Sequence, residues 1–291
     1  MKITVFTPTY NRAYIIENLY HSLQQQTCTD FEWLVIDDGS SDNTGELFAA
    51  WQQEDNAFPI RYYYFENCGK PKEINRALDL AEGELFFTVD SDDLLTSNAV
   101  ELILRWAQTI PQGEKFCAFA GSDGDMNGIP TNPIFHKPFV DATFFDRDPN
   151  CPAFIGYDRP WVFYTKIHKQ YKYPEFPGER FITEAVAWNR MAHDGYMVRC
   201  FDDVIYLWEH QPEGYTARIA ETLTNNPQGF GLWKKELLQF QSANFWERLK
   251  TYRWFYHDLR HKYSPMQIAG FIGAPTWQIK LIHHLSQWKH R

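Results

Sequence analysis

Residues 31–40 read FEWLVIDDGS, in which six mostly apolar residues are followed by two aspartates and a Gly-Ser turn. A short apolar run that ends in turn residues is typical of a strand buried on both faces. Similar runs occupy residues 2–7, 61–65 and 85–89, and apolar residues recur at helical spacing in residues 13–26, 41–51, 73–81 and 97–109. This β-α alternation over about 110 residues predicts a mostly parallel α/β sheet with helices on both faces.

Polar clusters follow three of the four predicted strands. They lie at residues 7–11, 37–41 and 90–93. Because the carboxyl ends of strands in an open parallel sheet meet at one edge, and ligands bind there, we expect these clusters to lie close together. The sequence therefore predicts a binding site at this edge.

The last of these clusters is Asp90-Ser91-Asp92-Asp93. Carboxylates at this spacing can share a hard cation with phosphate oxygens, and such a cation would neutralise a diphosphate leaving group. Taken alone, the same residues could be a turn that caps the following helix. Asp38 could bind a base or ribose, or it could be an ordinary turn residue. Lys70 could bind a phosphate, or it could be an ordinary surface lysine.

Composition and missing motifs exclude several classes of protein. The formal net charge of −9 argues against a protein that coats nucleic acid. Neither Gly-x-Gly-x-x-Gly after the first strand, nor a P-loop, nor Gly-x-Ser-x-Gly occurs, which disfavours dinucleotide oxidoreductases, P-loop NTPases and serine hydrolases. The five cysteines are widely spaced and indicate a reducing compartment without a zinc site. We also expect no signal peptide and no membrane-spanning helix.

Several motifs, in this order and spacing, resemble the family 2 glycosyltransferases with the Rossmann-like GT-A fold. They are TPTYNR at residues 7–12, FEWLVIDDGSSDNT at 31–44, Gly69-Lys70, Asn75, AEGE at 81–84 and DSDD at 90–93. The resemblance is strongest over residues 1–110. Residues 115–177 match nothing in the family's pattern, so the resemblance does not extend to the donor sugar or the acceptor.

The resemblance implies a role for each matching residue on the nucleotide side. The nucleotide-sugar site would comprise Pro8, Tyr10, Asp38, Lys70, Asn75, Asp90 and Ser91. Asp38 would bind the base, often uracil in this family, and Asp90 would lie nearer the ribose. Asp92 would be the direct ligand of Mn²⁺ or Mg²⁺, and His210 matches a position where some relatives add a metal or diphosphate contact.

Glu184 is the predicted catalytic residue. It lies in FITEAV at residues 181–186, within a helix predicted over residues 179–193. Apolar neighbours would desolvate the carboxylate and suit it to act as a general base, although a carboxylate near the start of a helix also complements the helix dipole. The resemblance implies the first role, because this segment is similar to the one that carries the family's acceptor-side carboxylate.

Through the family's usual reaction, the resemblance implies an inverting transferase that moves a sugar from a nucleotide-diphosphate sugar, a UDP-sugar above all, to a glycan or lipid-linked acceptor in surface polysaccharide synthesis. We expect residues 1–225 to form the GT-A domain, with a nucleotide half at 1–110 and an acceptor half at 111–225. Residues 226–291 would be a helical extension. The alternatives are a sugar-nucleotide pyrophosphorylase, whose glycine-rich loop is absent, and a non-catalytic nucleotide- or glycan-binding domain.

The C-terminal tail differs from the rest of the chain in charge. Residues 245–291 contain eight Lys or Arg and two Asp or Glu, so the tail carries +6 and the remainder −15. Aromatic residues interleave with these basic residues in helices predicted over residues 245–262 and 266–289, as in interfacial helices. The tail could also be an ordinary helical pair packed on the core. We expect a cytoplasmic protein, and the first alternative would make it peripheral at the inner face of the membrane.

Overall fold

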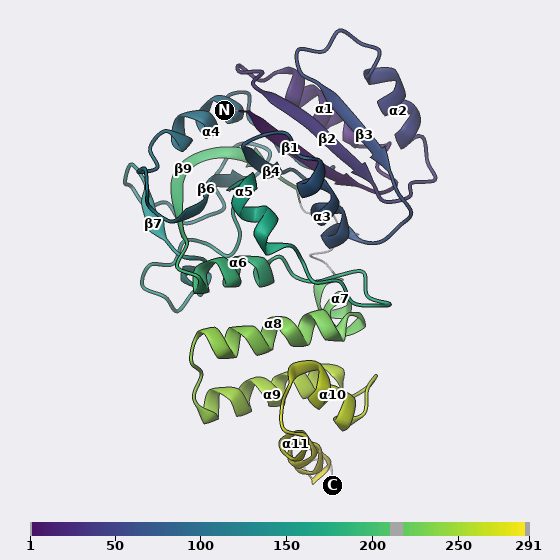
Figure 1. Cartoon of the computed structure of the whole chain (residues 1–291), viewed down its shortest axis with the longest axis vertical. Coiled ribbons are helices and arrows are strands. Elements are labelled where there is room, and N and C mark those ends of the chain that lie inside the picture. The colour runs from purple at the N-terminus through teal and green to yellow at the C-terminus, as the bar shows by residue number, and fades with distance from the viewer. Residues whose placement is uncertain (1, 210–217, 289–291) are drawn as a thin grey trace. The chain divides into compact units, whose positions relative to one another are not determined.

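Four parallel strands form the first half of a large sheet (Figure 1). They are β1 (Ile3–Thr9), β2 (Phe31–Asp37), β3 (Ile60–Tyr64) and β4 (Leu85–Thr88). In this computed structural model, which describes residues 2–209 and 218–288, β1 pairs with β2 and β4, and β2 pairs with β3. The predicted parallel α/β arrangement is confirmed.

The sheet continues beyond β4 with mixed pairing. Its order is β3-β2-β1-β4-β8-β6-β9-β5, and β7 pairs with β9. The added strands are β5 (Leu94–Leu95), β6 (Phe116–Gly124), β7 (Val140–Ala142), β8 (Trp161–Tyr164) and β9 (Met197–Leu207). Strand β9 is continuous over its whole length, because it follows β6 through register shifts instead of breaking.

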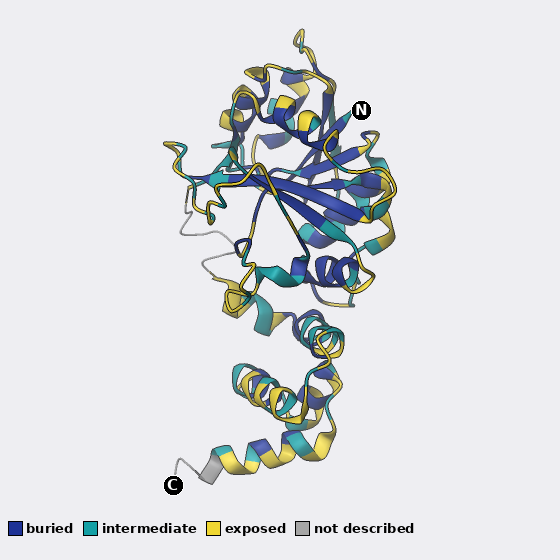
Figure 2. Ribbon diagram, turned by 90° about the vertical axis from the view of Figure 1, so that its left-hand side faces the viewer, coloured by how far each residue is buried: buried dark blue, intermediate teal, exposed yellow. Residues whose placement is uncertain are grey.

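Helices cover both faces of the sheet. One face packs against α1 (Ile16–Gln24), α2 (Thr44–Trp51) and α4 (Ala99–Ala107). Strands β1 and β2 are buried along their whole length, and Figure 2 shows the middle of the sheet as mostly buried. Trp33 of β2 stacks there with Tyr20 of α1, their ring centroids 5.9 Å apart. These buried aromatic rings hold the helices to the strands.

The other face carries α3 (Lys70–Leu80) and α5 (Thr165–His168). The 3₁₀ turn η2 (Lys169–Tyr171) directly follows α5 and contacts α3, and a second 3₁₀ turn, η1 (Phe144–Arg147), precedes β8. Phe6 of β1 stacks on Phe86 of β4 at 5.5 Å, and the His168 ring lies edge-on to Phe86 at 5.7 Å. Side chains alternate between the two faces along each strand, so β1 serves both cores.

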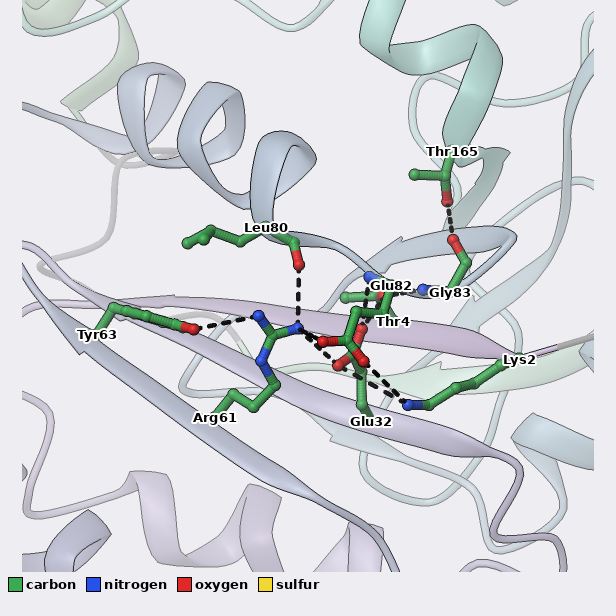
Figure 3. A network of polar contacts seen from close by, with 9 residues as sticks. All are labelled: Lys2, Thr4, Glu32, Arg61, Tyr63, Leu80, Glu82, Gly83 and Thr165. Atoms are coloured by element: carbon green, nitrogen blue, oxygen red, sulfur yellow. Dashed lines mark hydrogen bonds and ion pairs between the residues drawn. The ribbon is translucent and has the colours of Figure 1, made fainter.

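A buried carboxylate ties together the amino ends of the parallel strands (Figure 3). Glu32 has no exposed surface and accepts hydrogen bonds from the Thr4 hydroxyl at 2.6 Å and from Arg61 at 2.9 Å. The Glu82 backbone N–H donates to the same carboxylate at 2.8 Å. Although burial acts to raise the pKa of Glu32, these hydrogen bonds hold it below its usual value.

The chain divides into two compact units, Met1–Lys172 with Asp194–His210 and Tyr173–His193 with Gln211–Arg291. The second unit contains α6 (Ala185–His193), α7 (Ile219–Asn225), α8 (Pro227–Phe240), α9 (Phe245–Leu259), α10 (Pro265–Ile272) and α11 (Thr276–Trp288). The expected boundary after residue 225, between a GT-A domain and a helical extension, stays a prediction.

The helical unit is joined by both polar and apolar contacts. Arg190 of α6 forms an ion pair with Glu236 of α8 at 2.6 Å.

The prediction of a single helix over residues 266–289 was wrong, because α10 ends at Gly273, whose φ of 67° is left-handed, and Pro275 follows. Across residues 2–209 and 218–288, no helix combines the length and apolar character needed to cross a membrane.

Candidate functional site

The polar segments after β1 and β2 are joined by hydrogen bonds. Asn11 Oδ1 accepts a hydrogen bond from the Ser41 backbone N–H at 2.8 Å, and the Asn11 N–H donates to Ser40 Oγ at 2.8 Å. Asn11 has a φ of 52°, a left-handed conformation that asparagine tolerates better than most residues. The two strand ends therefore form one polar surface.

Two adjacent aspartates at the end of β2 do different work. Asp37 is fully buried and accepts hydrogen bonds from the Tyr62 hydroxyl at 2.5 Å and the Ser40 N–H at 2.7 Å. Burial and this bond raise the pKa of Tyr62. Asp37 therefore stabilises the turn that follows β2 through these buried hydrogen bonds.

Asp38 fixes the loop that precedes α3. Its two carboxylate oxygens accept the backbone N–H groups of Cys68 at 2.6 Å and Gly69 at 2.9 Å. Gly69 has a φ of 93°, which favours glycine, and the next residue is Lys70, the first of α3. Asp38 thereby sets the position from which Lys70 extends.

Lys70 in turn connects this loop to the end of β4. Its Nζ lies 2.8 Å from Asp90 Oδ1 and 3.0 Å from Asp90 Oδ2. Arg12, from the segment after β1, places Nη2 3.7 Å from Asp92 Oδ2. The three predicted clusters and Lys70 thus meet at one edge of the sheet, with two cations facing two carboxylates.

Tyr206 of β9 orders the turn at residues 90–93, and the sequence analysis did not single it out. Its hydroxyl donates to Asp93 Oδ2 at 2.6 Å and accepts the Asp90 N–H at 3.1 Å. Burial and the nearby charge of Asp90 raise the pKa of Asp93 to about 8. Asp93 is therefore largely protonated near neutral pH.

Glu73 is a second residue that the sequence analysis missed. It lies in the first turn of α3, is 2% exposed, and its Oε1 is buried without a hydrogen-bond partner. Burial, and then the charge of Asp38, raise its pKa to about 9, so the side chain is a neutral acid at pH 7. Its spacing from the buried Ile74 and Ala77 could have placed it on the inner face of the helix.

The remaining predicted residues of the nucleotide side surround this edge. Pro8 is buried in β1 opposite Ile36 of β2, and Tyr10 follows β1 with half of its surface exposed, 51%. Asn75 is buried in α3, and Ser91 is buried between the two carboxylates of its turn. Their contribution to nucleotide binding stays a prediction.

The predicted base does not belong to the unit that carries this edge. Glu184 belongs to the helical unit and is half-buried in the turn before α6, so the expectation that it lies inside a helix was wrong. The helix starts one residue later, and the Glu184 carbonyl accepts the Ala187 N–H at 3.1 Å. His210 lies outside the described residues.

The acidic turn offers part of a metal site. Within residues 2–209 and 218–288, no group of three or more His, Cys, Asp or Glu could hold a metal ion. Asp90 and Asp92 supply the carboxylate oxygens that Mg²⁺ prefers, and Mg²⁺ in phosphate-transfer sites is commonly bound by one or two carboxylates together with the phosphates of the substrate. The donor set fits a cation that arrives with a diphosphate.

Comparisons with known proteins show the family and the fold of this chain. The sequence model described as glycosyl transferase family 2 matches residues 4–180. A relative from Campylobacter jejuni subsp. jejuni serotype O:2, GalNAc(5)-diNAcBac-PP-undecaprenol beta-1,3-glucosyltransferase, is 35% identical over 108 residues, which are 36% of this chain and 34% of that protein. In three other curated glycosyltransferases that are similar to this chain, the matched segment spans about a third to about half of the relative's length.

Two solved structures share the fold. S. aureus TarS 1–349 in complex with UDP-GlcNAc superimposes with a TM-score of 0.63 at 17% identity, over 98% of this chain and 87% of that one. The mannosyltransferase PcManGT from Pyrobaculum calidifontis, in complex with GDP-Man and Mn²⁺, gives a TM-score of 0.56 at 17% identity, over 100% of this chain and 88% of that one. The predicted GT-A fold is confirmed.

Proposed function

Since the chain belongs to glycosyl transferase family 2, we propose that it moves a sugar from a nucleotide-diphosphate sugar to an acceptor hydroxyl. The observation that carries this proposal is the run of contacts from Asp38 through Gly69 and Lys70 to Asp90. These contacts bring Asp38, Lys70 and the acidic turn to one edge, which supports binding of the base by Asp38 and of the phosphates by Lys70.

We propose a UDP-sugar as the donor. TarS, which shares the fold, was solved with UDP-GlcNAc, although PcManGT was solved with GDP-Man. The Campylobacter relative is named for a lipid-linked glycan, which supports a glycan or lipid-linked acceptor and a place in surface polysaccharide synthesis. A cytoplasmic protein, peripheral at the inner face of the membrane, completes the proposal.

We propose that the sugar is transferred with inversion in a single displacement. Lys70 and Arg12 pair with the diphosphate, Asp38 orients the base, and Glu184 removes the proton from the acceptor hydroxyl. Asp92, with His210, would hold Mn²⁺ or Mg²⁺. The metal, when bound, supplies Lewis-acid stabilisation of the leaving diphosphate.

A panel of UDP- and GDP-sugars tests this function. With Mn²⁺, the matching donor should raise the melting temperature, since it binds only the folded chain, and should release nucleoside diphosphate when acceptor is added. NMR of the product should show the opposite anomeric configuration to the donor. Donor binding without any release of nucleoside diphosphate, across acceptors, would support the alternative of a non-catalytic binding domain.

A further inference from the structure

Helix α11 has one face that is firmly packed within the helical unit. Ile279 and Ile282 are 0% and 7% exposed and join a core with Phe255 of α9 and Ile268 of α10. The Tyr256 hydroxyl also lies 2.7 Å from His283 Nδ1. The packing fixes the rotation of α11 about its axis, and hence which side chains face outward.

The outward face of α11 is apolar as well. Trp277, Leu281 and Leu285 are 62%, 48% and 58% exposed. They are four residues apart, so they form one stripe along the helix. Large apolar side chains gathered on a surface usually mark a contact site.

Basic residues accompany this stripe, and acidic residues are missing from it. Lys280 and His284 are exposed on the same side of α11, each three residues after a member of the stripe. From residue 259 to the end of the chain there are five Lys or Arg, four His and no Asp or Glu. A surface that binds this face of α11 must therefore offer both an apolar layer and negative charge.

These observations favour one occupant over another. A second copy of the chain in a two-fold dimer would bring the same basic face against itself, which is electrostatically unfavourable. An anionic lipid surface instead offers acyl chains for the stripe and phosphate groups for the flanking lysine and histidine. Exposed tryptophan is also typical of helices at the membrane interface.

We propose that α11 binds anionic phospholipid surfaces, with Trp277, Leu281 and Leu285 inserted at the headgroup level. The helix lies in the plane of the interface and does not cross the bilayer. The inference deepens the peripheral membrane location proposed above and rests on that part of the proposal alone. It needs neither donor nor acceptor, so a failed flotation test would leave the proposed transferase activity standing.

Vesicle flotation of the full chain tests the proposal. We expect co-flotation with phosphatidylglycerol-containing phosphatidylcholine vesicles, weaker binding to pure phosphatidylcholine, and further weakening as salt screens the charges. The double variant Leu281→Ser, Leu285→Ser should bind at least about tenfold more weakly, because it removes two of the three apolar side chains. Its melting temperature should match the wild type, because both positions are exposed.

The control is Ile129→Ser, Ile134→Ser, which removes two apolar side chains with similar exposure from the first unit and should float like the wild type. Equal flotation of the α11 variant and the wild type would overturn the proposal. So would a wild-type chain that binds neither kind of vesicle. A stable dimer that dissociates in the α11 variant, without vesicle binding, would assign the stripe to a second copy and would also overturn it.

Discussion

Lys70 Nζ lies 2.8 Å from Asp90 Oδ1, although the two residues come from different βα units. The contact joins the loop after β3 to the acidic turn after β4. A bound diphosphate would offer Lys70 a stronger partner than a half-exposed carboxylate, because phosphate oxygens accept charge-assisted hydrogen bonds. The ion pair therefore marks where the phosphates are expected.

Replacing Lys70 tests the phosphate contact. Lys70→Gln should weaken donor binding by about tenfold, which is about 1.4 kcal/mol, because it removes a cation from the diphosphate. Isothermal titration calorimetry with the matching nucleotide sugar measures the change. The neighbouring substitution Lys72→Gln removes the same charge two residues away and should leave affinity unchanged. Equal losses in the two variants would assign the effect to overall charge.

Asp92 tests the metal requirement. Asp92→Asn keeps the size of the side chain but removes its charge, so donor affinity should no longer rise when Mn²⁺ is added. Calorimetry with and without Mn²⁺ compares the variant with Asp55→Asn, an exposed residue on the loop before β3. If Asp92→Asn binds donor as the wild type does in Mn²⁺, Asp92 is not a ligand.

Replacing Glu184 tests its proposed role as the general base. Glu184→Gln should lower turnover by about 10²–10⁴-fold, the usual contribution of a general base, and should leave donor affinity unchanged. Kinetics of nucleoside diphosphate release measure the first and calorimetry the second. Glu221→Gln, an exposed residue of α7 in the same unit, serves as the control. A variant that keeps full turnover would remove Glu184 from the mechanism.

Replacing Glu73 tests whether its raised pKa makes the stability of the folded chain depend on pH. Its pKa is about 9 in the folded chain and near 4.5 when unfolded, so its contribution to stability is fully present below about pH 4.5 and is lost as the pH rises toward 9. Glu73→Gln mimics the neutral acid. The variant should therefore gain stability over the wild type between pH 5 and pH 8, by at most about 1.4 kcal/mol per pH unit.

Urea unfolding at both pH values measures this gain for Glu73→Gln. The exposed Glu66→Gln should show the same stability difference from the wild type at pH 5 and pH 8. A difference between Glu73→Gln and wild type that does not change with pH would show that Glu73 is not held neutral.

Glu32 tests the buried network. Glu32→Ala should lower the free energy of unfolding by about 3–5 kcal/mol, because it leaves Arg61 and the Thr4 hydroxyl without their shared acceptor. Glu82, 61% exposed, lies 3.2 Å from the same Arg61, and Glu82→Ala should cost less than about 1 kcal/mol. Denaturant unfolding separates the two, and equal costs would contradict the assignment.

The same carboxylate has a lowered pKa, so its contribution is present above the unfolded pKa and is lost as the pH falls through the folded one. The gap in stability between wild type and Glu32→Ala should therefore narrow in acid. A gap that widens as the pH falls would contradict this sign.

Local pattern was enough for the sheet and for the edge where the polar residues gather. Apolar runs such as residues 31–36 and the aspartates that follow them determine which strands are buried and where they end, because strand length and turn chemistry are local properties. The approach of Asp38 and Lys70 to Asp90 followed from topology, since parallel strands present their carboxyl ends on one side.

Tertiary structure decided the protonation of Glu73 and Asp93, the role of Tyr206, and which face of α11 is outward. Glu73 has no sequence neighbour that would mark it as neutral, because its pKa depends on burial and on Asp38, 35 positions earlier in the chain. Desolvation and charge act through space, so the sequence determines the elements and the edge where they meet, while the packing of distant segments determines the charge that each side chain carries there.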